Sequence, residues 1–219
     1  MVPQARSETT RQKILGAAID VFCEVGYAAA GLGEVIERAG MTKGALYHHF
    51  DSKEALATAI IEQGTNLTRD AFHRVCESPS PALENMIHGV FIVADLLVSD
   101  KTARTAEQLT RALAEFNSTA AQVWSGRLDA MTAQASLASA EGDLREGLDP
   151  YGVGESILNS MLGAQLLSKT ADGDDHLKRL TRSLELLLPA IVADTSLAYF
   201  REYLDRESLR HRQVGEPTD

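Results

Sequence analysis

Two short stretches near the start of the chain carry apolar residues at helical spacing, and a glycine separates them. The first places its apolar residues on one side of a helix with about 3.6 residues per turn: Leu32, Val35, Ile36 and Ala39. Gly40 favours a helix end, because glycine adopts the left-handed conformation that a C-terminal cap commonly needs. Thr42 is a typical N-cap for a second helix, in which Ala45, Leu46 and Phe50 can anchor to the first. The spacing predicts a helix-turn-helix, although helical hairpins that bind no nucleic acid share it.

The second helix of this pair carries polar residues away from its apolar anchors. Thr42 and Lys43 stand at the helix start, where free backbone N–H groups and the helix dipole favour phosphates. Gly44 lets a duplex approach closely, and Tyr47 and His48 offer donors to phosphates or base edges. These residue types indicate DNA binding. The candidate DNA-contacting residues are Arg11, Thr42, Lys43, Gly44, Ala45, Tyr47, His48 and Lys53.

Helical patterning extends over the rest of the chain. High Ala and Leu content with few β-branched runs predicts six or seven further helices beyond Leu56. Breaks are expected at residues 78–81, 99–100, 141–143 and 171–175, which are rich in Ser, Pro, Gly and Asp. The fold class is therefore all-α, with an N-terminal three-helix domain that contains the helix-turn-helix and a C-terminal helical bundle. We expect a DNA-binding domain at 1–52, a ligand-binding and dimerisation domain at 53–212 and a disordered tail at 213–219.

Four segments of the predicted bundle have distinct patterns. Lys53 to Cys76 is expected to form one long connecting helix, and Leu83 to Val98 is apolar around most of its circumference, which is typical of a central helix. Val153 to Ser168 mixes large apolar with small residues and suits close pairing of helices. The fourth segment is a leucine repeat with coiled-coil-like spacing, interrupted by Pro189, which kinks or ends the helix: Leu177, Leu180, Leu184, Leu187 and Ile191. Pairing with a second chain is favoured for these last two segments, and an intramolecular core is the alternative.

Charge is unevenly distributed along the chain, whose formal net charge is -10. Residues 1–60 hold six Lys and Arg against seven Asp and Glu, whereas residues 61–219 hold fifteen against twenty-four. We expect an acidic larger module that repels DNA non-specifically. Arg6, Arg11, Lys43 and Lys53 then form a local basic face that binds phosphates.

Several classes of protein are disfavoured. The two cysteines lie in predicted helices and no secretory segment is present, so no disulfide framework is expected; Cys23 packs in its helix, and Cys76 remains a possible reactive thiol. No stretch approaches the roughly 20 apolar residues that span a bilayer, which predicts a cytoplasmic protein without membrane contact. Phosphate-binding glycine loops, nucleophile elbows and zinc-spaced His or Cys pairs are lacking. We therefore predict no enzymatic activity, no catalytic residue, no cofactor and no metal site.

Five motifs follow one another between Arg11 and Leu56: R-x-x-I-L-x-A-A, F-x-x-x-G-Y, E-V-I-x-x-A-G, T-K-G-A-L-Y-H-H-F and S-K-E-x-L. With these motifs the run resembles the DNA-binding domain of TetR-type transcriptional repressors. The resemblance implies a homodimer that places two recognition helices about 34–36 Å apart on a palindromic operator. One departure concerns the cap of the first motif helix, where family members usually carry Ser or Thr. Ala30 and Gly31 stand here, so one hydroxyl contact to phosphate is missing and its effect on DNA affinity is open.

The larger module resembles the γ-butyrolactone-receptor group of actinomycete repressors, which includes butenolide and furan-type receptors. The residues that carry this resemblance are Val123-Trp124, Glu141 to Arg145, Leu148-Asp149-Pro150, Ser156-Ile157, Ser160, Gly163, Gln165 and Ser168. In that group the matching tryptophan lines the effector cavity. The resemblance therefore implies the ligand-binding residues Trp124, Gln63, Met86, Val90, Ser160, Met161 and Gln165. Each also has a purely structural alternative, because tryptophan fills cores and buried Gln or Ser often satisfies backbone groups. Between residues 77 and 120 the resemblance says little.

The implied mechanism is release of DNA by a small hydrophobic effector. Effector binding tilts the helix from Lys53 to Cys76 and moves the paired DNA modules out of register with the operator, which frees antibiotic or secondary metabolite genes for transcription. The identity of the effector, the operator sequence and the target genes stay open. So do three alternatives: an efflux regulator that responds to drugs, a pseudo-receptor that binds antibiotics, and a ligand-binding protein that has lost DNA binding.

Overall fold

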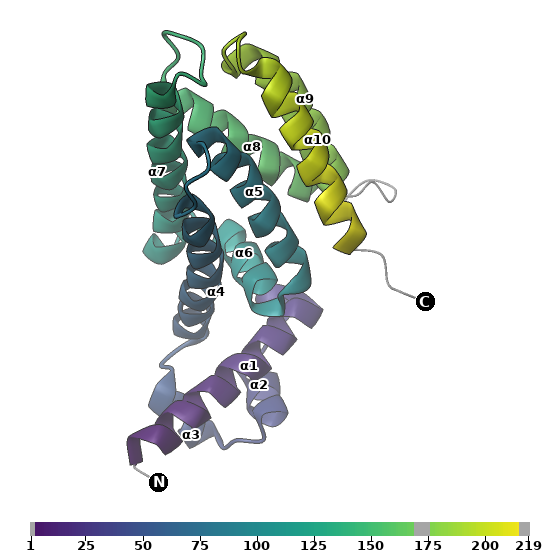
Figure 1. Cartoon of the computed structure of the whole chain (residues 1–219). Coiled ribbons are helices and arrows are strands. Elements are labelled where there is room, and N and C mark those ends of the chain that lie inside the picture. Colours follow the sequence, from purple (N-terminus) through teal and green to yellow (C-terminus); the bar gives the residue numbers. More distant parts are fainter. Residues whose placement is uncertain (1–2, 169–175, 215–219) are drawn as a thin grey trace. The chain divides into compact units, whose positions relative to one another are not determined.

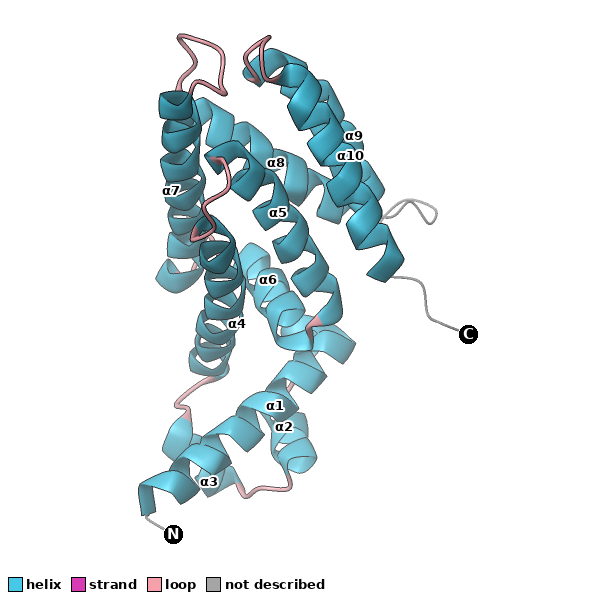
Figure 2. Ribbon diagram, in the orientation of Figure 1, coloured by secondary structure: helices cyan, strands magenta, loops and turns pink. Residues whose placement is uncertain are grey.

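The computed structural model describes residues 3–168 and 176–214, and ten α-helices account for most of them (Figure 1, Figure 2). Their bounds are α1 Pro3–Ala29, α2 Leu32–Ala39, α3 Lys43–His49, α4 Lys53–Cys76, α5 Ala82–Ser99, α6 Lys101–Leu113, α7 Ser118–Glu141, α8 Pro150–Ser168, α9 His176–Ile191 and α10 Leu197–Val214. The expected all-α fold is confirmed, and α4 has the bounds predicted for the connecting helix. The helices form two compact units, Met1–Thr68 with Leu97–Val123 and Arg69–Leu96 with Trp124–Asp219.

In the first unit α1 packs against α2 and α6. Its apolar stripe explains this, because Ile14, Leu15 and Phe22 are at most 2% exposed and lie in one core with Leu46 of α3. The backbone of α1 leaves the helical conformation at Gly26, which has a φ of 79°. α1 is therefore kinked at Gly26, where glycine suits the positive φ that few other residues accept.

α4 and α6 approach each other closely in the first unit. A Cβ atom added to Gly64 of α4 would lie 2.3 Å from the Cβ of Ala106 and 2.8 Å from the carbonyl oxygen of Thr102. Only glycine therefore fits at this crossing, and the middle of α4 is fixed against α6.

α5 lies in the core of the second unit. By length and composition this helix is able to cross a membrane, but 67% of it is buried inside the protein, as expected of a central helix. Met86, Ile87, Val90 and Phe91 are completely buried. At Gly89 the ring of Phe72, from the last turns of α4, lies 2.6 Å from where a Cβ would stand. The C-terminal part of α4 is therefore fixed against α5.

α9 packs between α8 and α10 in the second unit. Leu177, Leu180, Leu184 and Ile191 are at most 5% exposed within the single chain. The expectation that the leucine repeat pairs with a second chain is therefore wrong for these residues, because they bury their side chains in the core of their own unit. Pro189 lies inside the last turn of α9, and the helix ends two residues later.

Most of the predicted breaks between helices are found in the structure. One break was not predicted, and two predicted segments lie wholly or mostly outside the described residues. Residues 78–81 separate α4 from α5, and Asp100 caps α6 by accepting from Ala103 N–H at 2.8 Å. An unpredicted break precedes α7, where Asn117 accepts from Ala120 N–H at 3.0 Å. The predicted break at 171–175 lies outside the described residues, as does most of the expected tail, since α10 extends to Val214. The boundary at residue 53 between a DNA-binding and a ligand-binding domain stays a prediction, because the two units are defined by contacts within the chain and not by function.

Candidate functional site

The helix-turn-helix is formed by α2, a three-residue turn and α3. Gly40 ends α2 with a φ of 59°, and its N–H bonds to the carbonyl of Glu37. Thr42 begins α3 by accepting a hydrogen bond from Ala45 N–H at 3.2 Å. Leu46 and Phe50 are 0% and 4% exposed, so they anchor α3 to the first unit's core. Both predicted helix ends are confirmed, as are two of the three predicted anchors, Leu46 and Phe50, whereas Ala45 is only half-buried.

The opposite side of α3 is free to meet a ligand. Thr42, Lys43, Gly44 and His48 are exposed, and Tyr47 is 42% exposed although it is aromatic. A Cβ atom added to Gly44 would meet no atom within 4 Å, and its φ is not positive. Neither packing nor backbone conformation of the chain itself requires glycine here.

Three further candidate residues flank this surface and are half-buried: Arg11, Ala45 and Lys53. The Arg11 guanidinium lies 5.3 Å from the Phe50 ring centroid. Lys53 Nζ donates to the Ala28 carbonyl at 3.3 Å and lies 4.5 Å from the Tyr27 ring centroid. The structure brings all eight candidate DNA-contacting residues into the first unit, and their contacts with DNA stay predictions.

The N-terminus of α2 lacks a side-chain cap. Gly31 occupies the N-cap position in an extended conformation and makes no side-chain hydrogen bond. A Cβ there would meet nothing within 4 Å. The missing hydroxyl is therefore no consequence of crowding, and a Ser cap would fit.

Ion pairs offset part of the acidic charge of the first unit. Arg38 donates to both carboxylate oxygens of Glu24, at 2.6 and 2.8 Å, and Lys101 donates to Asp20. The hydrogen bond from Arg38 lowers the pKa of Glu24. Glu24 and Asp20 are thus paired with cations of the same unit. Lys43 of α3 is exposed and adds a positive charge to the surface of that helix.

The seven predicted ligand-binding residues are divided between the two units. Gln63 is half-buried on α4 in the first unit, and the other six belong to the second. Met86 and Val90 are four residues apart on α5 and completely buried. Trp124 on α7 is half-buried, with the Arg127 guanidinium 5.0 Å from its ring. Ser160, Met161 and Gln165 lie on α8.

Gln165 has an unusual environment. Its side chain is 7% exposed, and its carbonyl oxygen Oε1 is buried without a hydrogen-bond partner. Ser160, by contrast, donates to the carbonyl of Ser156 at 2.9 Å, which is the structural role that the alternative interpretation gave it. A buried acceptor without a donor costs free energy, about 1–3 kcal/mol, and a ligand hydroxyl would remove that cost.

A cleft of about 680 Å³ in the second unit was not predicted. Its charged lining residues are Arg74, Glu84, His88, Arg206, Glu207 and Arg210. None of the seven predicted ligand-binding residues lines it. Sequence reasoning missed it because its two sides come from α4 and α5 and from α10, which are distant in the chain.

The chain matches known proteins at two levels. Residues 14–60 match the model of the bacterial regulatory proteins of the tetR family. The chain is 29% identical to the A-factor receptor protein of Streptomyces griseus over 202 residues. This match covers 92% of this chain and 70% of that protein.

Solved structures agree over most of the chain. A γ-butyrolactone receptor, an ArpA-like protein, has a TM-score of 0.76 at 26% identity, over 93% of this chain and 99% of that one. CprB from Streptomyces coelicolor, solved in complex with its operator sequence, has a TM-score of 0.75 at 28% identity, over 94% and 99%. These relatives are transcriptional regulators and not enzymes. Residues 14–60, which contain the helix-turn-helix of α2 and α3, therefore form a DNA-binding domain of the tetR family, and over most of its length the chain is similar to the γ-butyrolactone autoregulator receptors.

Proposed function

We propose that this regulator is a repressor that binds a palindromic operator as a homodimer and leaves it when a γ-butyrolactone, butenolide or furan-type molecule binds. We further propose that it works in the cytoplasm and controls antibiotic or secondary metabolite genes. The observation that carries the proposal is the likeness to a receptor over 92% of the chain, and not over the DNA-binding domain alone. Its ligand-binding module is therefore included in the likeness.

The exposed face of α3 supports operator binding by this chain. Lys43 and the Thr42 cap stand at the start of α3, where phosphates are favoured. Tyr47 and His48 follow on the exposed side. Lys53, which contacts Ala28 and Tyr27, supports the end of α1 and reaches phosphate only if its side chain turns outward.

Exposed leucines on two helices support the homodimer. Leu166 and Leu167 of α8 are 57% and 52% exposed, and Leu186 of α9 is 82% exposed. These residues replace the leucine repeat as the candidate contacts with a second chain, because the repeat is buried in its own unit. Sedimentation of the full chain at micromolar concentration gives a dimer if this is right and single chains if it is wrong.

α4 supports the coupling between effector and DNA. Its residues up to Thr68 belong to the first unit and those from Arg69 to the second. Gly64 fixes it against α6, and Phe72 against α5 at Gly89. Effector binding then tilts α4, which is the mechanism that the resemblance implies.

The effector is tested with the single tryptophan of the chain, Trp124. We expect its fluorescence to change saturably when a γ-butyrolactone is added to the full-length protein, with butenolides, furan acids and drugs compared as a panel. Trp124→Phe serves as the fluorescence blank. If drugs saturate the signal and lactones leave it unchanged, the efflux regulator or the antibiotic-binding pseudo-receptor replaces the lactone receptor.

The uncapped start of α2 favours one further candidate, a ligand-binding protein that has lost DNA binding. Gly31 supplies no hydroxyl for phosphate. A gel shift with the promoter region upstream of its own gene separates the two functions, because a repressor retards that fragment and the alternative leaves it free.

A further inference from the structure

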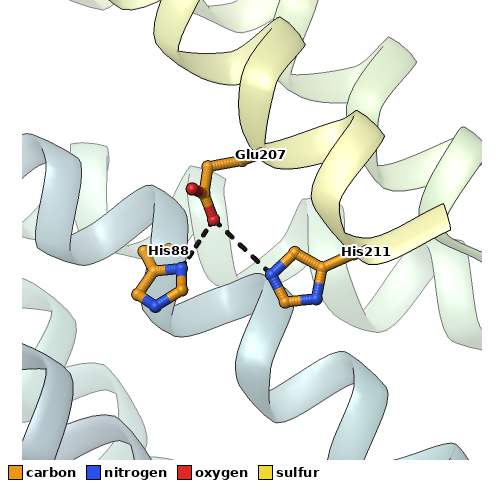
Figure 3. A group of neighbouring side chains, drawn as sticks. All are labelled: His88, Glu207 and His211. Carbon is orange, nitrogen blue, oxygen red and sulfur yellow. Dashed lines mark hydrogen bonds and ion pairs between the residues drawn. The ribbon is translucent and has the colours of Figure 1, made fainter. Parts of the chain in front are cut away.

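Four side chains that the proposed repressor function does not use meet between α5 and α10 in the second unit. His88 and Asp95 are seven residues apart on α5, two turns along one face, and Glu207 and His211 are four apart on α10. Both imidazoles lie beside the Glu207 carboxylate (Figure 3). Glu207 and His211 are 2% and 5% exposed, whereas the side chains of His88 and Asp95 are 25% and 29% exposed.

The distances among three of these side chains suit a bound cation. His88 Nδ1 lies 2.6 Å from Glu207 Oε2, and His211 Nε2 lies 3.5 Å from the same oxygen. One ligand atom from each residue lies within 4.8 Å of the others. Two ligands of a tetrahedral zinc ion are about 3.4 Å apart, because Zn–N and Zn–O bonds are about 2.0–2.2 Å long. The hydrogen-bonded contact between His88 and Glu207 must therefore widen by about 0.8 Å to admit an ion, whereas the separation of His211 Nε2 from Glu207 Oε2 already matches.

Surrounding contacts orient the same three ligand atoms. Asp95 bonds Nδ1 of His211, which leaves Nε2 for a cation, and this buried Nε2 makes no hydrogen bond. Arg210 donates to Oε1 of Glu207 at 2.9 Å and leaves Oε2 directed at the histidines. The Phe91 ring stacks on His211 with centroids 5.4 Å apart. Metal-binding histidines almost always donate their second ring N–H to such a carboxylate or carbonyl.

Charged groups of both signs surround the three ligand atoms. Asp95 and Glu207 are acidic, whereas the Arg210 guanidinium donates to Glu207 Oε1 at 2.9 Å. A metal ion at Nε2 of His211 would take the place of a proton, because imidazole binds metals in its neutral form.

We propose that His88, Glu207 and His211 bind a divalent transition-metal ion, and that Zn²⁺ fits two imidazoles and one carboxylate best. His88 and Glu207 also line the cleft described above, which gives the ion a path from solvent and a place for a water ligand. Because the ligands come from α5 and α10, the ion joins the C-terminal helix to the core of the second unit. This site is independent of the lactone.

The test uses full-length protein that has been freed of metal with a chelator and then titrated with Zn²⁺ by calorimetry. We expect one tight site per chain and, at a free Zn²⁺ concentration about 100 times Kd, a rise in Tm of about 5–10 °C. His88→Gln should weaken binding more than about tenfold, since it removes a ligand. His88 is partly exposed, so this variant is expected to fold.

Two comparisons make the test decisive. His73→Gln changes an exposed histidine of α4 outside the group and should leave affinity for Zn²⁺ unchanged. Asp95→Asn keeps all three ligands but weakens the hydrogen bond to His211, so affinity should fall about 10–100-fold. Co²⁺ in place of Zn²⁺ should give the visible spectrum of a four-coordinate ion, and His88→Gln should lose it. Absence of saturable Zn²⁺ binding, or equal affinity in His88→Gln and wild type, would overturn the proposal and leave the group an ion-paired network.

Discussion

At the scale of single residues, Gly44 offers a test of the proposed contact between α3 and DNA. Its position is open and its backbone is an ordinary helical one, so alanine costs the fold nothing.

We predict that Gly44→Ala is at least as stable as the wild type and lowers operator affinity about tenfold, because alanine favours the helix and its methyl group holds the duplex away. Anisotropy of a labelled operator and urea unfolding measure the two effects. Gly16→Ala on α1, where a Cβ also meets nothing within 4 Å, should leave operator affinity unchanged. Equal operator binding by both variants would remove Gly44 from the DNA-contacting surface.

Substitution of Gln165 should change stability and effector binding in opposite directions. Gln165→Met removes a buried acceptor that has no donor, so the free energy of unfolding should rise by about 1 kcal/mol, while lactone affinity falls about tenfold. Urea unfolding and Trp124 fluorescence titration measure these changes. Thr181→Val is the matched control, since Thr181 is buried but donates to Leu177 at 2.8 Å. It should destabilise the protein without affecting the lactone. A Gln165→Met protein with unchanged lactone affinity would assign Gln165 to the core alone.

Partial burial disfavours the thiolate of Cys76, the residue that the sequence left open as a reactive thiol. Removal from water raises the pKa of its thiol to about 11, so the thiolate forms only near and above that pH. We predict that iodoacetamide modifies Cys76 in the folded protein about tenfold more slowly at pH 8 than in urea. Peptide mapping by mass spectrometry measures the rate. Equal rates in the folded and unfolded chain would show an activated thiol.

At the scale of elements, local signals placed helix ends well. Gly40 and Thr42 end and begin helices as predicted, because caps act within a few residues of the chain. The break before α7 was missed, since Asn117 caps it without a nearby Gly or Pro.

Local sequence signals did not predict which surface covers the apolar face of a helix. The leucine repeat correctly identified Leu177, Leu180 and Leu184 as buried, but periodicity does not say whether the surface that covers them belongs to the same chain. The group of His88 and Glu207 was missed for a related reason, because 119 residues separate two side chains that the fold brings to 2.6 Å. Short-range motif searches do not find such groups.

The crossing of α4 and α6 gives a prediction for an element. Gly64→Ala should lower the free energy of unfolding by about 1–3 kcal/mol, because its Cβ would lie 2.3 Å from that of Ala106. The substitution should also reduce the effect of the effector on operator binding, because the added methyl group would push α4 away from α6 and α4 couples the two sites in our proposal. Gly16→Ala is again the control and should raise stability by about 0.5–1 kcal/mol. If Gly64→Ala were as stable as Gly16→Ala, the close crossing would not exist.

At the scale of the whole molecule, charge separates the DNA-binding part from the rest. Residues 1–60 are nearly neutral overall, and residues 61–219 carry most of the net charge of -10. This distribution favours contact with DNA through the first unit and repels it elsewhere. In our proposal the acidic remainder binds the effector, because the similarity to the A-factor receptor protein extends over 92% of the chain.

The central claim is that one dimer binds operator and effector at each other's expense. The most direct measurement is the affinity of the full-length protein for a labelled operator, selected from random duplexes, with and without saturating γ-butyrolactone. We predict that the lactone weakens operator binding about 5–150-fold, and that operator weakens lactone binding by the same factor. Equal operator affinity in the presence and absence of every lactone, butenolide and furan tested would contradict the account.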